Sequence, residues 1–166
     1  MRPIILCLAL SIPSICVAQN ATNPQQTPTQ RAFFVKQETY RTTGTAVLSA
    51  EHAREEVQAC PSGLDPDSIN LCLDSEFKIT QKNYQSYIKA LSGLLRLGSP
   101  DIPNLPGTAK EFEKAELSWT AYRDTQCRTA SNVRPGAIQG YLYLTCEQNL
   151  TRSHMDEIAN LYADLW

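Results

Sequence analysis

The sequence lacks an excess of positive charge. It carries 15 lysine and arginine residues against 17 aspartate and glutamate residues, a formal net charge of -2. A protein that binds nucleic acid needs a basic face to meet the phosphates, so this balance argues against nucleic acid as a partner. Mild acidity is typical of a soluble exported protein, and it is also compatible with a basic protein partner.

The motifs of common catalytic centres are also missing. The sequence contains no G-x-S-x-G, no H-E-x-x-H and no glycine-rich phosphate loop. The two histidines, His52 and His154, lack the spacing to cysteines that a zinc site requires, and there is no C-x-x-C pair. Adjacent carboxylates such as Glu55 and Glu56 diverge around a helix instead of converging on one substrate. We therefore predict that the chain is not an enzyme and needs no metal or cofactor.

Long apolar runs are absent after the start of the chain. The first 18 residues have the form of a signal peptide, with Arg2 near the start, an apolar run over 4–10 and the small Ala18 before the expected cut. The apolar run is too short to span a bilayer. We predict a signal peptide over 1–18 and a periplasmic or secreted protein without a membrane span.

Four of the six cysteines remain once the leader is removed, and an even number in an exported chain predicts two disulfides. Cys127 lies nine residues before Gly136 and Cys146 ten residues after it, so the two sides of a helical hairpin would place them face to face. Cys60 precedes a predicted helix, and Cys72 lies about two turns into it, within reach of the preceding loop. The predicted disulfides are Cys60–Cys72 and Cys127–Cys146.

Apolar periodicity predicts an all-α domain over 46–166, a small disulfide-bridged bundle with a long helix and a C-terminal helical hairpin. Residues 19–45 begin with a stretch rich in Gln, Thr and Pro and are predicted to be flexible or arm-like. Helices are expected over 49–59, 66–97 and 108–130 and after Gly140, the long one capped by Asp65. The last two should bury these residues: Phe112, Ala115, Trp119 and Tyr122 on one, and Leu142, Leu150, His154, Ile158, Leu161 and Leu165 on the other.

The third of these helices carries the segment Leu117-Ser118-Trp119-Thr120-Ala121-Tyr122-Arg123-Asp124-Thr125-Gln126-Cys127. It resembles the W-x-x-Y-R-D-x-x-C signature of the LprI-type lysozyme inhibitor family, and Cys146, Leu150 and Thr151 match the pattern downstream. The sequence departs from that pattern at His154 and Met155, where an arginine is usual, and Arg152 directly follows the threonine. The resemblance covers residues 60–163. It implies a small disulfide-bridged helical domain, export from a bacterium and inhibition of lysozyme.

The signature residues Trp119, Tyr122, Arg123 and Asp124 allow two interpretations. The aromatic pair either packs in the core, which is usual at helical spacing, or anchors a partner. Arg123 either pairs with a carboxylate of another helix, Glu147 or Asp156, or reaches with Asp124 toward a partner.

Two functions of different class follow for the whole chain. The first is an inhibitor that binds lysozyme, a basic enzyme with an acidic catalytic cleft, through the loop over 99–107 or the loop over 132–140. Its candidate partner-binding residues are Arg134, Asn132 and Asp101. The second is a periplasmic structural or adaptor module that binds an envelope component without inhibiting lysozyme.

Overall fold

Four α-helices and one short 3-10 helix make up the residues that the computed structural model describes, which are 27–55, 60–98 and 105–166. The helices are α1 (Pro28–Glu55), α2 (Pro66–Leu97), α3 (Leu105–Asn132) and α4 (Ala137–Leu161), followed by η1 (Ala163–Leu165). These ranges contain no strand, which confirms the predicted all-α class. No helix within them is long and apolar enough to cross a membrane.

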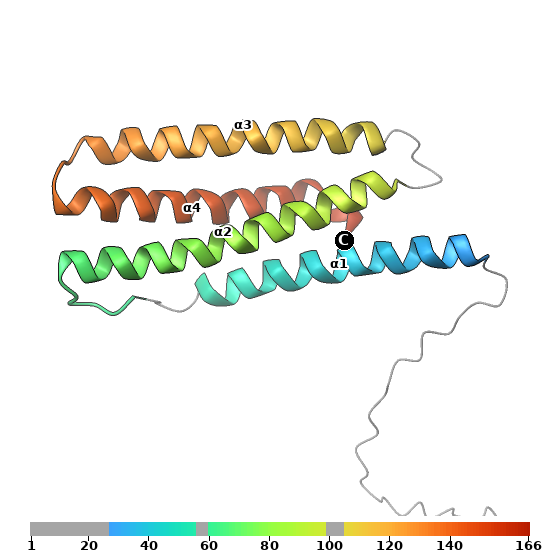
Figure 1. Ribbon diagram of the computed structural model, residues 1–166, viewed down its shortest axis with the longest axis horizontal. Helices are drawn as coiled ribbons and strands as arrows, with labels where there is room; N and C mark the ends of the chain where they lie inside the picture. The colour runs from blue at the N-terminus through green and yellow to red at the C-terminus, as the bar shows by residue number, and fades with distance from the viewer. Residues whose placement is uncertain (1–26, 56–59, 99–104) are drawn as a thin grey trace, which may run out of the picture.

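The helices run antiparallel to one another in chain order, and α2 lies at the centre of the bundle (Figure 1). The α3–α4 hairpin packs on one side of α2, and α1 packs on the other. This up-and-down order needs only short connections between neighbours, as in other four-helix bundles. The predicted long helix and C-terminal helical hairpin are both confirmed.

The predicted long helix has the expected start and end. Asp65 caps α2 by accepting hydrogen bonds from the backbone N–H groups of Asp67 and Ser68, and Pro66 occupies the first helical position. Gly98 ends the helix with φ +68°, a left-handed conformation that a residue with a Cβ seldom adopts. The turn chemistry that is readable in the sequence therefore fixes both ends of the central helix.

The hydrophobic core lies where α2 meets α3, α4 and the chain's C-terminus. Its buried members are Tyr84, Tyr87, Leu91, Leu95, Ala109, Phe112, Met155 and Ile158. Trp166, the last residue, stacks on Tyr87 with ring centroids 5.1 Å apart. The C-terminus is thus built into the bundle instead of trailing from it.

The N-terminal helix differs from the prediction. Residues 28–45, which the sequence placed in a flexible or arm-like segment, form the first two thirds of α1. Of the helix expected over 49–59, residues 49–55 form the last part of α1, and 56–59 lie outside the described residues. The predicted leader over 1–18 and residues 19–26 lie outside the described residues. The full length of α1 could not be predicted because its inward face is mixed: its buried residues are Gly44 and Glu51, and only the partly buried Val47 and Leu48 pack against the hydrophobic core.

Glu51 holds α1 to two other helices. Its carboxylate is 2% exposed and accepts hydrogen bonds from Thr80 and Asn83 of α2, both at 2.6 Å, and from Arg152 of α4 at 2.8 Å. Burial by itself raises the pKa of Glu51, but the hydrogen bonds from Thr80, Arg152 and Asn83 and the charge of Arg54 outweigh it, so the pKa lies below its ordinary value. The carboxylate is thereby kept ionised inside the interface.

Two glycines let aromatic side chains approach the helices closely. A Cβ added at Gly44 of α1 would lie 2.1 Å from the Trp166 ring, and one added at Gly93 of α2 would lie 2.5 Å from the Tyr40 ring. α1 therefore docks through close shape complementarity and the polar contacts of Glu51, together with the partly buried Val47 and Leu48.

The predicted inward faces of α3 and α4 were partly wrong. Ala115, Tyr122 and Leu161 are exposed, while charged or polar residues take inward positions: Glu116 and Arg123 on α3, and Glu147, Gln148 and Thr151 on α4. Residues three and four apart lie on the same side of a helix, so Glu116, Trp119 and Arg123 form one continuous face. A prediction from apolar residues alone selects Ala115 and Tyr122, each of which stands one position before a residue that is buried, Glu116 or Arg123.

Candidate functional site at the disulfide-clamped end

The two disulfides of the structure are those predicted from spacing. Cys60 is bonded to Cys72 with Cα atoms 5.9 Å apart, and Cys127 is bonded to Cys146 with Cα atoms 5.5 Å apart. The first ties the segment before α2 to that helix, and the second ties α3 to α4 close to their connecting turn. Each cross-link thus restrains a turn at one end of the bundle.

Arg123 of the signature lies inside the bundle, beneath the second disulfide. It is 2% exposed, and its Nε lies 2.8 Å from a Glu147 carboxylate oxygen of α4. It also donates to the Thr151 hydroxyl at 3.1 Å and to the neighbouring Asp124 at 2.7 Å. Of the two carboxylates considered for Arg123, Glu147 is therefore the one that it pairs with.

The surroundings of the Glu147 carboxylate disfavour its ionised form. Burial raises its pKa above the ordinary value; the Arg123 charge opposes that rise, and the nearby Asp124 charge adds to it. One of its oxygens, Oε1, is buried without a hydrogen-bond partner. The Arg123–Glu147 pair therefore joins α3 to α4 in a specific register and contributes little net stability by itself.

Trp119 packs against the core as an aromatic stack. Its ring lies 3.8 Å from the His154 ring at an interplanar angle of 8° and 5.5 Å from the Tyr84 ring. His154 contacts Glu116 at 3.1 Å, and the Tyr84 hydroxyl donates to the same carboxylate at 2.7 Å. Trp119 therefore takes the packing role, one of its two predicted alternatives, whereas Tyr122 points outward and is 57% exposed.

The turn between α3 and α4 presents two of the three predicted partner-binding residues. Asn132 and Arg134 are both exposed, and the Asn132 side chain accepts a hydrogen bond from Gln139 at 2.7 Å, which spans the turn. Within the described residues the Arg134 guanidinium has no ion-pair partner. The third predicted residue, Asp101, lies outside the described residues.

The turn over 60–65 lies at the same end of the bundle as the turn over 133–136 (Figure 1). We call these two turns and the adjoining starts of α2 and α4 the clamped end. The clamped end contains a shallow cleft of about 390 Å³, which is lined by Leu64, Pro66, Ile69, Ile138 and Tyr141. Beside it Val133 is 76% exposed, and Leu64, Ile138 and Tyr141 are also large, exposed apolar residues. Such a group of exposed apolar side chains is characteristic of an interaction surface.

Sequence analysis found the charged and polar members of the clamped end but not its apolar members. Leu64 and Val133 stand inside turns, and Ile138 and Tyr141 stand at the start of a helix, where apolar residues are usually assigned to the core. The signal that could have identified them is their position beside Cys60 and between Cys127 and Cys146. Apolar residues in a cross-linked turn cannot fold back into the core as freely as those of an open loop.

The fold and the clamped end together define a small, disulfide-stapled four-helix protein. Comparison with protein-family models matches residues 61–158 to the family described as lysozyme inhibitor LprI. The chain therefore belongs to the LprI lysozyme inhibitor family, which the W-x-x-Y-R-D-x-x-C segment indicated. The match begins after α1, so the helix held by Glu51 lies outside it.

An uncharacterized protein of Rhizobium meliloti (strain 1021) is 27% identical to the chain over 123 residues, which cover 70% of the chain and 86% of that protein. No solved structure matches.

Proposed function

We propose that the protein is exported and inhibits lysozyme by binding it stoichiometrically through the clamped end. The observation that carries this proposal is membership of the LprI lysozyme inhibitor family, whose model matches the part of the chain that contains both disulfide-clamped turns. The two disulfides also fit an oxidising compartment, such as the periplasm or the outside of the cell.

Binding rather than catalysis is the chemistry that the described residues favour. Their buried carboxylates are engaged with other helices: Glu51 with Arg152, Glu116 with Tyr84, and Glu147 with Arg123. Each is committed to holding the bundle together, and each lies away from the two exposed turns. The proposed activity therefore needs only a surface that excludes substrate from lysozyme.

The clamped end offers a cation and an apolar surface side by side. Arg134 projects from the α3–α4 turn, next to the exposed Val133. The catalytic cleft of lysozyme contains two carboxyl groups, which an arginine can meet by charge-assisted hydrogen bonds. Because the turn is already restrained by Cys127–Cys146, ordering it on binding costs little conformational entropy.

Lysis of bacterial cell walls by lysozyme, followed as a loss of turbidity, tests the proposal. Increasing amounts of the purified, oxidised protein should inhibit in proportion to their amount, with a break at a fixed molar ratio to enzyme. Arg134→Ala should weaken inhibition by about 10-fold or more, the loss expected for an arginine buried in an interface. Arg31→Ala is the matched control, because Arg31 is also exposed and stands in the first turn of α1. The start of α1 lies at the opposite end of the bundle from the α3–α4 turn (Figure 1).

A folded protein with intact disulfides that leaves lysozymes of the common classes unaffected, in molar excess and at low salt, would end the inhibitor proposal. The adaptor function would then take first place. An equal loss of inhibition in Arg134→Ala and Arg31→Ala would still support lysozyme inhibition, but it would show that the contact surface is not the clamped end.

A further inference from the structure

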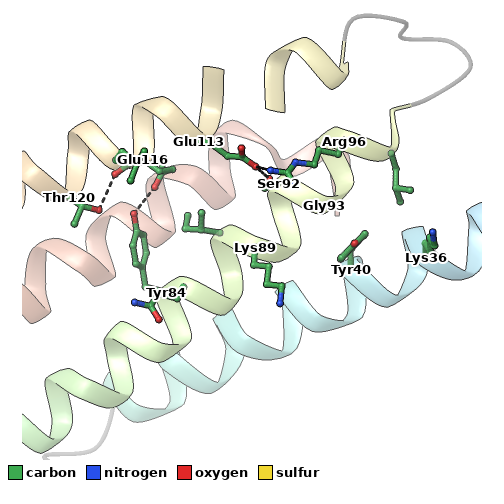
Figure 2. A pocket seen from close by; sticks show the side chains of 14 residues that line it. Lys36, Tyr40, Tyr84, Lys89, Ser92, Gly93, Arg96, Glu113, Glu116 and Thr120 are labelled. Atoms are coloured by element: carbon green, nitrogen blue, oxygen red, sulfur yellow. Dashed lines mark hydrogen bonds and ion pairs between the residues drawn. The ribbon is translucent and has the colours of Figure 1, made fainter. Parts of the chain in front are cut away.

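A second recess lies away from the clamped end, along the exposed side of α2. It has a volume of about 590 Å³, with residues of α2 as its floor and residues of α1 and α3 as its two walls (Figure 2). We call it the α2 groove. Its size falls within the range of about 300–1,000 Å³ that is usual for small-molecule sites.

The lining of the α2 groove is mixed, and each of its three helices contributes apolar or aromatic residues to it. Ile88, Gly93 and Leu97 of α2 line it, Tyr40 of α1 stands at one side, and Leu117 of α3 stands at the other. Leu117 is 75% exposed, although it neighbours core residues of the same helix. An apolar chain laid along this floor would cover side chains that now contact water, which is the main source of affinity in such sites.

Around the groove, the acidic side chains have polar partners among the described residues, whereas two lysines have no ion-pair partner there. Glu113 accepts a hydrogen bond from Ser92 and pairs with Arg96, and Glu116 accepts from Tyr84 and contacts His154, so both carboxylates are engaged. Lys36 and Lys89 also line the groove and are exposed (Figure 2). Among the residues that the structure describes, neither ammonium group has an ion-pair partner. The unsatisfied charge of the groove is therefore positive.

From this combination we infer that the α2 groove binds a straight-chain aliphatic carboxylate, a fatty-acid-like molecule. Its apolar chain lies on Ile88, Leu97 and Leu117, and its carboxylate pairs with Lys89 and Lys36. An anion suits the groove because the two lysines lack partners, whereas a cation would find both carboxylates already engaged. An aliphatic tail suits it because Ile88 and Leu97 of α2 and Leu117 of α3 offer branched apolar side chains along the groove.

α1 makes this site possible. It supplies Lys36 and Tyr40, and Tyr40 reaches its position because Gly93 leaves room for the ring against α2. The groove shares no lining residue with the cleft at the clamped end, so it is separate from the surface proposed for lysozyme. One property can therefore fail while the other holds.

Isothermal titration of the purified, oxidised protein with sodium dodecanoate, below its micellar concentration, tests the site. We expect saturable binding of one molecule, weakened at least 10-fold by Lys89→Glu and by Leu117→Glu. Both substitutions are at exposed positions, so circular dichroism should report an unchanged fold. Lys82→Glu is the matched control, because Lys82 is an exposed lysine of the same helix that does not line the groove.

Two further ligands separate charge from hydrophobicity. Dodecylammonium has the same chain with the opposite charge and should bind at least 10-fold more weakly than dodecanoate. Dodecanol should fall between them. Absence of dodecanoate binding, equal affinity for the two ions, or an equal loss in Lys82→Glu and Lys89→Glu would overturn the proposal. Lysozyme inhibition by Lys89→Glu, measured in parallel, should equal that of the unsubstituted protein.

Discussion

Glu51 of α1 and Arg152 of α4 are 101 residues apart in the sequence, and their side chains meet at 2.8 Å inside the bundle. Glu51 is almost fully enclosed, and Thr80 and Asn83 of α2 complete its hydrogen bonds. One carboxylate thus binds three helices together. Together with the partly buried Val47 and Leu48, which pack against the hydrophobic core, it holds α1 to the bundle.

Replacing Glu51 by alanine should destabilise the protein strongly. The change leaves the Arg152 side chain, which is 14% exposed, without its carboxylate and removes the acceptor of the hydrogen bonds from Arg54, Thr80 and Asn83. Loss of one partner from a buried pair costs about 3–5 kcal/mol. Chemical denaturation followed by circular dichroism measures the free energy of unfolding. Glu55→Ala, at the exposed last residue of the same helix, should change it by less than about 0.5 kcal/mol. Equal effects of the two substitutions would contradict the role given to Glu51.

The pH dependence of stability should separate Glu51 from Glu147. The folded-state pKa of Glu51 is below its ordinary value of 4.5, so the folded protein binds fewer protons there than the unfolded chain. The stability contributed by Glu51 is therefore complete above about pH 4.5 and is lost as the pH falls through its folded pKa. In Glu51→Gln the part of the stability loss at acidic pH that comes from Glu51 should be absent.

Glu147 should change the free energy of unfolding with pH in the opposite direction to Glu51. Its folded-state pKa is raised above the ordinary 4.5, so the folded protein holds the proton more tightly than the unfolded chain. As the pH rises from 4.5 through the folded pKa, this group lowers the free energy of unfolding. Glu147→Gln should remove that decline, which unfolding curves across the window would reveal. A decline of the same size in both proteins would assign it to another group.

The close contact between Gly44 and Trp166 gives a test of the C-terminus. Gly44→Ala would place a methyl group where the Trp166 ring now lies and should push the ring off Tyr87. Overpacking of this kind costs about 1–3 kcal/mol. Gly107→Ala is the control, since no atom of the described residues lies within 4 Å of a Cβ there and alanine favours the helix. Thermal unfolding should therefore show a lower midpoint for the first substitution and an unchanged or higher midpoint for the second.

Much of the fold could be predicted because local chemistry specifies it. Asp65, Pro66 and Gly98 mark the ends of α2, and the spacing of four cysteines around the helix ends gave both disulfides. These signals are local: each depends on residues within one turn or one hairpin. The W-x-x-Y-R-D-x-x-C segment then indicated the family.

What could not be predicted depends on contacts between distant residues. α1 has no apolar stripe, so nothing in its own sequence shows that Glu51 would be buried by Thr80 and Arg152. The inward position of Glu116 was missed for the same reason, because charged residues are normally assigned to the surface. The pairing of Arg123 with Glu147, by contrast, was one of its two predicted alternatives. At the clamped end, Arg134 and Asn132 were found from turn chemistry, whereas the apolar Val133 and Ile138 were not.

Trp119 and Tyr122 lie three positions apart in the signature and should respond very differently to truncation. Trp119 stacks on His154 and packs against the core, so Trp119→Ala should cost about 3 kcal/mol, the low end for a large aromatic because this ring is partly exposed. Tyr122 points into solvent, and Tyr122→Ala should stay within about 0.5 kcal/mol of the unsubstituted protein. Denaturation midpoints measure both changes. Lysozyme inhibition, assayed well below the unfolding transition, should survive in Trp119→Ala, since its side chain does not reach the clamped end. Loss of inhibition in a folded Trp119→Ala protein would instead make the aromatic stack part of the binding surface.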